Sequence, residues 1–132
     1  MHIACATEPM EMPMFAFLTG NRAARMSAEE AVQKSRRGDV VVIDIRDGSE
    51  LAATGKAKGA LHVPMAALAM RCDPQSPDCL PELRSGKPIA VYCASGARSG
   101  MACGTLRRMG HAAVHNIGGL AKWQRAGGEI TR

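Results

Sequence analysis

Apolar and polar residues alternate in blocks along most of the chain, and each block has the period of a helix or of a strand. The segment SAEEAVQKSRRGD predicts a helix that ends near Gly38, because Ser27 and Glu30 form a capping box ahead of an apolar stripe. The run VVVIDI (40–45) is continuous and β-branched. Such a run is typical of a strand that is covered on both faces.

The alternation continues toward the C-terminal end. Further helices are predicted over 49–55, 65–71, 99–110 and 120–128, and further strands over 60–63, 89–93 and 112–117. The helix over 99–110 has one apolar face, on which we expect Met101, Ala102, Thr105, Leu106 and Met109. Gly118-Gly119 predicts a tight turn, and prolines make the loop CDPQSPDCLP irregular. Alternating strands and helices indicate an α/β fold with a mostly parallel sheet and helices on both faces.

The length and composition of the chain favour a single globular domain. With 132 residues, of which 46% are apolar, there is room for one core, and we expect it to lie in residues 26–132. Residues 1–25 show no steady period and are predicted to be an N-terminal extension of unknown role. Glu8, Glu11 and two prolines interrupt this start, so no secretory signal is expected. No window is long and apolar enough for a membrane span, and the expected location is the cytoplasm.

Charge and cysteine usage exclude several classes of function. The net charge of +5 comes from scattered Lys and Arg, so we expect no nucleic-acid partner, although a mild positive field favours small anionic substrates. The chain has an odd number of cysteines and no C-x-x-C motif, which argues against a disulfide framework and against a zinc site, so no metal is expected; they are Cys5, Cys72, Cys79, Cys93 and Cys103.

The segment CASGARSG (93–100) is the strongest candidate for a reactive site. Cys93 is the last residue of a predicted buried strand, at the sheet edge where α/β proteins bind ligands. The four residues that follow are small enough for the backbone to curl into an anion-binding nest that lowers a thiol pKa; they are Ala94, Ser95, Gly96 and Ala97. Arg98 supplies either a cation or a tether to the sheet. Ser99 is predicted to cap the next helix.

Other polar residues have simpler interpretations. Cys103 lies inside a predicted helix and is expected to be a small core residue, and Trp123 is expected to pack in the core. His62 and His115 are expected to be structural. Cys72 and Cys79 bracket the proline-rich loop, where a redox role and a metal site are both less favoured than inert thiols.

Three segments together resemble the successive motifs of single-domain rhodaneses, a family of sulfurtransferases. They are VVIDIRDGSELAATGKAKGALHVP, VYCASGARS and NIGGLAKWQRAGG, and the resemblance runs from about Met26 to Ile130. It implies a three-layer α/β fold with a sheet of about five strands, a catalytic Cys93 and a persulfide intermediate. No metal or organic cofactor is then needed, because the protein itself carries the sulfur.

The resemblance also implies a supporting role for residues after the first strand. Asp44 and Arg46 would brace the active loop, the alternative being a surface ion pair of little consequence. Glu50 would pair with Arg46 or Arg98, or favour the start of its own helix.

Two departures qualify the resemblance. The glycine-histidine pair of the family is Gly55-Lys56 here, which removes any role for that histidine. Arg98 is the only cation in the loop, whereas family members that use thiosulfate often carry more, so thiosulfate is expected to be a poor donor.

The expected activity is transfer of a sulfane sulfur through a Cys93 persulfide. The donor would be thiosulfate, a persulfide or a polysulfide, and the acceptor cyanide or a thiol, including a thiol of another protein. The alternative is a sulfur carrier or regulatory binding module with little turnover. A cysteine phosphatase is less favoured, because Cys93 and Arg98 are separated by four residues, one fewer than in such phosphatases, and the loop holds no acid.

Overall fold

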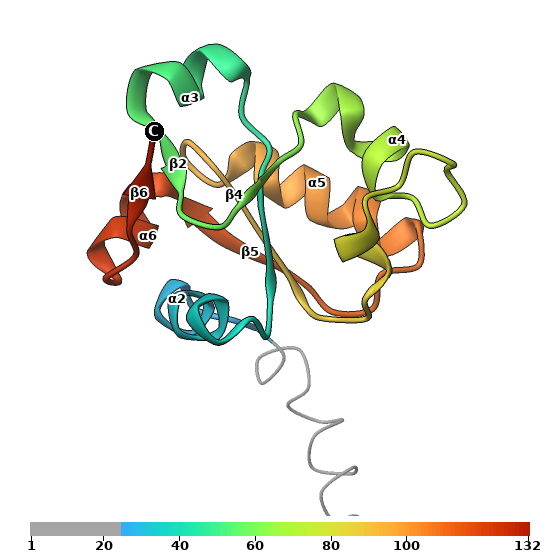
Figure 1. Ribbon diagram of the computed structural model, residues 1–132, viewed down its shortest axis with the longest axis horizontal. Helices are drawn as coiled ribbons and strands as arrows, with labels where there is room; N and C mark the ends of the chain where they lie inside the picture. The colour runs from blue at the N-terminus through green and yellow to red at the C-terminus, as the bar shows by residue number, and fades with distance from the viewer. Residues whose placement is uncertain (1–24) are drawn as a thin grey trace, which may run out of the picture.

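The structure is a computed structural model that describes residues 25–132 (Figure 1). The predicted extension, residues 1–25, therefore lies almost wholly outside the described residues. In chain order the elements are α2 (Ala28–Arg37), β1 (Val41–Asp44), α3 (Gly48–Thr54), β2 (Lys56–Ala57), β3 (Leu61–His62), η1 (Met65–Ala67), α4 (Leu68–Cys72), η2 (Pro81–Arg84), β4 (Ile89–Cys93), α5 (Ala97–Arg108), β5 (Val114–Gly119), α6 (Leu120–Arg125) and β6 (Ile130–Thr131).

A parallel sheet with the strand order β3-β1-β4-β5 forms the centre of the fold. The α/β class and the mostly parallel sheet are confirmed. The main sheet has four strands, fewer than the resemblance implies, because Lys56–Ala57 pairs antiparallel with Ile130–Thr131 in a separate ribbon. All four parallel strands end at one edge, so the segments that follow β1 and β4 meet there.

Alternate residues of the central strands build two cores. Ile43, Val91 and Cys93 face one core, together with Leu68 of α4 and Leu106 of α5. The opposite core holds residues from α2 and α6 and the other face of the same strands: Val32, Val40, Val42, Ala90, Tyr92 and Trp123. Figure 1 shows α2 and α6 on the opposite side of the sheet from α4 and α5. This explains why the strand sequences are apolar throughout.

The helix predictions hold for most elements. Ser27 Oγ accepts a hydrogen bond from the Glu30 N–H at 3.0 Å, and Gly38 ends α2 in the left-handed region at a φ of 77°. The predicted helix over 65–71 is a 3₁₀ turn followed by the short helix α4. Among these described residues, no helix combines the length and apolar character needed to cross a bilayer.

Two sequence predictions are wrong. The first placed Met101 on the apolar face of the helix over 99–110. Met101 is 62% exposed, because the buried face of α5 is formed by Ser99, Ala102, Cys103 and Leu106. Gly118-Gly119 is not a turn between elements. Strand β5 continues through both glycines, and Gly119 pairs with Cys93 across an irregularity in the register.

A buried polar network joins β1, β4 and the end of α3. Arg46 and Asp44 form an ion pair at 2.9 Å with side chains only 3% and 0% exposed, so the interpretation as a surface ion pair is wrong. The Tyr92 hydroxyl donates to Asp44 and accepts from the Ala57 N–H at 2.8 Å. Arg46 also donates to the carbonyl oxygen of Gly55 at 2.6 Å and to Thr54 Oγ1 at 2.9 Å. The network therefore fixes the C-terminal end of α3 to the sheet.

Replacing Tyr92 by Phe tests this network. The substitution leaves the Ala57 N–H without its partner and removes one donor from the buried Asp44 carboxylate. We expect the free energy of unfolding to fall by about 1–3 kcal/mol, measured by urea denaturation.

Lys58→Met is the matched control, because it breaks the Lys58–Glu129 pair, whose side chains are 70% and 65% exposed. It should change stability little. Equal stabilities for the two variants would show that the Tyr92 hydroxyl contributes nothing to the fold.

Candidate active site

Cys93 lies where β4 ends and the segment before α5 begins, at the carboxyl edge of the sheet. Its side chain has no exposed surface, whereas Ala94, Ser95 and Ala97 beside it are exposed. The sulfur therefore lies beneath a thin cover of small side chains. Residues 94–99 are together at this edge, as the sequence predicts, and we call residues 94–98 the cysteine loop.

Hydrogen-bond donors converge on the sulfur. The Gly96 N–H donates to Cys93 Sγ at 2.9 Å, and Ser99 Oγ lies 3.5 Å from the same atom. Burial alone raises the pKa of Cys93, but the Ser99 hydroxyl and the main-chain N–H groups of Ser99, Gly96 and Ser95 lower it by more. The net effect brings the pKa from 9.0 down to about 7. A large share of this thiol is therefore a thiolate at neutral pH.

Ser99 does not cap α5 as predicted. The helix begins at Ala97 with Gly96 as its N-cap, because Gly96 takes a φ of 107° that a residue with a side chain rarely adopts. Ser99 is consequently in the first turn of α5 and fully buried. This earlier helix start turns the Ser99 hydroxyl toward Cys93.

Asn116 is a polar residue of the site that the sequence analysis missed. Its Oδ1 accepts from Ser99 Oγ at 2.7 Å and from the Gly118 N–H at 2.9 Å, and its Nδ2 donates to the Gly96 carbonyl oxygen at 2.9 Å. These two backbone partners fix which end of the amide faces Ser99. The available signal was a carboxamide within the otherwise strand-like run AAVHNI, just before two glycines.

The single hydroxyl proton of Ser99 has two acceptors within reach. Because Asn116 Oδ1 can only accept, Ser99 donates to it while the thiol of Cys93 is protonated. When Cys93 loses its proton, the hydroxyl can rotate to donate to the thiolate, and Oδ1 keeps its bond from the Gly118 N–H. Asn116 thus holds Ser99 while Cys93 is protonated, and the hydroxyl proton is free to turn to the sulfur when Cys93 ionises.

Close backbone contact supports the cysteine loop from below. A Cβ atom on Gly119 would lie 2.2 Å from the carbonyl oxygen of Ala94, a distance that no side chain tolerates. The Gly118 backbone also lies near the loop, since a Cβ on Gly96 would be 3.4 Å from the Gly118 Cα. The two glycines at the end of β5 therefore let the loop rest directly on the strand.

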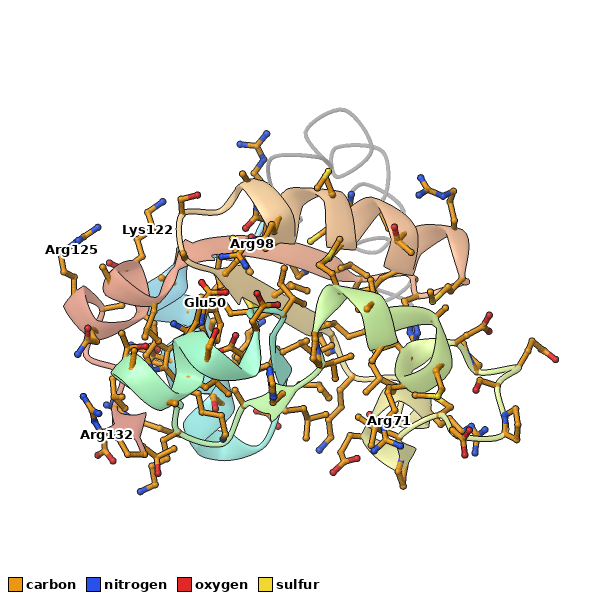
Figure 2. The ribbon with its side chains drawn as sticks, turned by 90° about the horizontal axis from the view of Figure 1, so that it is seen from above. Glu50, Arg71, Arg98, Lys122, Arg125 and Arg132 are labelled. Carbon is orange, nitrogen blue, oxygen red and sulfur yellow. The ribbon has the colours of Figure 1, made fainter. Side chains whose placement is uncertain are left out.

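Arg98 is tethered to α3. Its two terminal nitrogens donate to the two carboxylate oxygens of Glu50 at 2.8 and 2.9 Å, and Figure 2 shows the two side chains pointing toward each other. Glu50 also accepts from the Asp47 N–H at 3.0 Å, which caps α3. The hydrogen bonds from Arg98 and from that N–H lower the pKa of Glu50 to about 2. Of the two partners considered for Glu50, the structure shows Arg98. Glu50 also caps the start of its own helix, which was the other role considered.

Among the hydrogen bonds of residues 25–132, none joins the Asp44 or Arg46 side chain directly to the cysteine loop; Asp44 contacts Tyr92, the residue before Cys93, and Arg46 reaches the loop through α3. Among the hydrogen bonds within residues 25–132, those of Arg46 fix Thr54 and Gly55 at one end of α3, while Glu50 near its other end holds Arg98. The predicted bracing through α3 is therefore indirect. Arg46 fixes one end of α3 to the sheet, and Glu50 of α3 holds Arg98 of the cysteine loop.

Comparison with known proteins places this geometry in a family. A family model described as Rhodanese-like domain matches residues 27–126, most of the chain. The chain belongs to the rhodanese-like domain family. A protein from Allochromatium vinosum named sulfurtransferase is 36% identical over 90 residues, covering 67% of this chain and 76% of that protein. The protein YqhL of Bacillus subtilis, described as uncharacterized, is also 36% identical over 90 residues, and this match spans 62% of its length.

Solved structures share the rhodanese-like architecture. A protein of unknown function from Rhodopseudomonas palustris, described as a possible tyrosine phosphatase, is 36% identical with a TM-score of 0.71. The match covers 81% of this chain and 83% of that one. A human single-domain sulfurtransferase is 22% identical with a TM-score of 0.61, covering 76% of this chain and 95% of that one, a likeness that shows the fold alone.

Two other cysteines of this rhodanese-like domain have pKa shifts in the opposite direction to that of Cys93. Burial raises the pKa of Cys72 to about 12 and that of Cys103 to about 11, and both side chains lie in the same core. Cys79 is buried and free as well, and a redox role for Cys72 and Cys79 stays a prediction.

His62 Nε2 lies 2.7 Å from the Arg46 carbonyl oxygen, and burial lowers the pKa of His115. The predicted burial of Trp123 and Cys103 is confirmed.

A titration of thiolate absorbance in the ultraviolet tests the electrostatics of the site. The difference between wild type and Cys93→Ser should show one thiolate with a midpoint near pH 7. In Ser99→Ala the midpoint should rise toward that of an ordinary thiol, because the hydroxyl no longer stabilises the anion.

Cys103→Ser is the control for this titration. It removes a buried thiol of raised pKa and should leave the midpoint near pH 7 in place. A midpoint for Cys93 well above neutrality in the wild type would contradict the assignment of the loop N–H groups as stabilisers of the anion.

Proposed function

We propose that this rhodanese-like domain transfers a sulfane sulfur from a donor to an acceptor through a persulfide on Cys93. The observation that carries the proposal is the convergence of N–H and O–H donors on Cys93 Sγ, with a pKa of about 7. Family membership and the Allochromatium relative named sulfurtransferase support a sulfurtransferase activity in general.

In the first step the Cys93 thiolate attacks the outer sulfur of the donor. A bond forms between Sγ and that sulfur while the bond to the rest of the donor breaks, and its electron pair leaves with the departing thiolate or sulfite. The negative charge that the enzyme held on Sγ then lies on the outer sulfur. The N–H groups of the cysteine loop and the N-terminal end of α5 are the groups placed to stabilise it.

In the second step a thiolate or cyanide attacks the outer sulfur. Cyanide leaves as thiocyanate, a thiolate leaves as a persulfide, and Cys93 returns to the thiolate. This scheme requires a small anionic sulfur donor and a thiol or cyanide acceptor, and the acceptor thiol can belong to another protein. The chemistry proceeds through the cysteine alone, with no cofactor in either step.

The cover over Cys93 sets a condition for this reaction. Because the Cys93 side chain has no exposed surface, a donor reaches the sulfur only when part of the loop moves. The side chains above it are small and exposed at Ala94, Ser95 and Ala97, so the required displacement is short.

A cysteine phosphatase is the second candidate, favoured by the description of the Rhodopseudomonas neighbour as a possible tyrosine phosphatase. Two features of this chain speak against it. The loop between Cys93 and Arg98 has four residues, a small ring for a tetrahedral phosphate. Glu50 beside the loop has a pKa of about 2, so it is ionised at neutral pH and cannot protonate a leaving alkoxide.

Intact mass spectrometry tests the proposal. Separate incubation with thiosulfate, glutathione persulfide and polysulfide should add one sulfur atom to the wild type with at least one donor. Cys93→Ser should gain none, whereas Cys103→Ser should load as the wild type does, since the Cys103 thiol has a raised pKa. Failure of every donor to load Cys93 would overturn the proposal.

Turnover then separates the remaining alternatives. Steady-state thiocyanate formation that Cys93→Ser abolishes indicates an enzyme, whereas a persulfide that is stable in the presence of cyanide and thiols indicates a carrier or regulatory module. Hydrolysis of an aryl phosphate that depends on Cys93 would favour the phosphatase instead.

A further inference from the structure

We infer that Glu50 is a specificity-determining residue that selects against thiosulfate by neutralising Arg98. This inference rests on the proposed sulfur transfer and names the class of donor that the site accepts. The favoured donors are those that release a monoanion, such as thiosulfonates, which release a sulfinate, and organic persulfides, which release a thiolate.

The geometry leaves Arg98 no free charge to offer a substrate. Both carboxylate oxygens of Glu50 are matched to both terminal nitrogens of Arg98, and the two side chains are only 30% and 34% exposed. Such a paired fork is a strong, oriented interaction. Because the hydrogen bonds from Arg98 also hold the pKa of Glu50 at about 2, the pair stays ionised and net neutral at every physiological pH.

Other cations do not replace Arg98 at this position. Arg98 is the only basic residue of the cysteine loop. Lys122 and Arg125 of α6 are exposed, and Figure 2 shows them projecting outward. The Lys122 side chain lies against Gly118, beside the cysteine loop, since a Cβ on Gly118 would be 2.8 Å from Lys122 Cδ. Within the cysteine loop itself, main-chain N–H groups serve one sulfur anion, and no unpaired cation remains for a second anionic group.

Thiosulfate needs such a cation in both its ground state and its product. The Cys93 thiolate and thiosulfate carry three negative charges between them, and the products, a Cys93 persulfide anion and sulfite, carry the same three. The S–S bond of thiosulfate breaks with its electron pair on sulfite, a dianion. The loop N–H groups stabilise the sulfur that stays, so the departing dianion finds the cation of the loop, Arg98, already neutralised by the Glu50 carboxylate.

Benzenethiosulfonate provides the matched donor. It has the same bond between a sulfane sulfur and an oxidised sulfur, but it is a monoanion and releases benzenesulfinate, also a monoanion. The ratio of kcat/KM for thiosulfate to kcat/KM for benzenethiosulfonate therefore measures the penalty on the extra charge. Both reactions are followed as thiocyanate formation with cyanide.

Glu50→Gln should raise this ratio by about tenfold or more, because the guanidinium of Arg98 becomes free to bind the sulfonate group and the leaving sulfite. Gln keeps an oxygen that can accept from the Asp47 N–H, so α3 retains its cap. Glu50→Ala is the second variant. It loses the cap and its melting temperature should fall, yet the ratio should rise in the same way.

Two controls assign the effect to Arg98. Glu30→Gln removes the same charge from a pair with Lys34 on α2, whose side chains are 50% and 31% exposed, and should leave the ratio unchanged, which excludes an effect of net charge. In Glu50→Gln/Arg98→Gln the rise should disappear. An unchanged or lower ratio in folded Glu50→Gln and Glu50→Ala, with benzenethiosulfonate still used, would overturn the inference and leave the proposed sulfur transfer standing. Loss of sulfur loading from every donor in the wild type would overturn both.

Discussion

A buried sulfur anion held by main-chain N–H groups is the interaction on which the rest of the site depends. Burying a thiolate is unfavourable by itself, and the fold offsets this cost with the Gly96 N–H at 2.9 Å, further N–H groups and the Ser99 hydroxyl. These donors point at one atom only because the backbone turns sharply at Gly96. The loop must therefore be held in this turn whenever the anion is stabilised, and the residues described below serve that purpose, although part of the loop moves to admit a donor.

Three supports hold the cysteine loop from different directions. Asn116 on β5 binds both Ser99 and the Gly96 carbonyl oxygen, and Gly119 lets the loop lie directly on β5. Glu50 on α3 holds Arg98, while the buried Asp44–Arg46–Tyr92 network fixes the far end of α3 to the sheet. The polar residues at the carboxyl edge thus form a continuous set of contacts rather than isolated pairs. The same contacts that position the loop also decide which charges remain free at its mouth.

The sequence was sufficient for the fold class and for the position of the loop, but not for the contacts within it. Continuous apolar runs predicted β1 and β4 because strands covered on both faces leave that signature in a single segment. The start of α5 was misplaced by two residues, since Gly96 caps the helix through a backbone conformation and not through a side chain. That error gave Ser99 the wrong role. Asn116 escaped prediction, and the sequence could not choose between Arg46 and Arg98 as the partner of Glu50, because these contacts join residues 17 and 48 positions apart in the chain.

The most direct test of the central claim is a crystal structure of the protein after reaction with a sulfur donor. The account predicts a persulfide on Cys93 whose outer sulfur lies within the curve of residues 94–98 and accepts hydrogen bonds from their main-chain N–H groups, with Asn116 still bound to Ser99. An outer sulfur that points into solvent or into the apolar core, with the loop N–H groups bonded elsewhere, would contradict it.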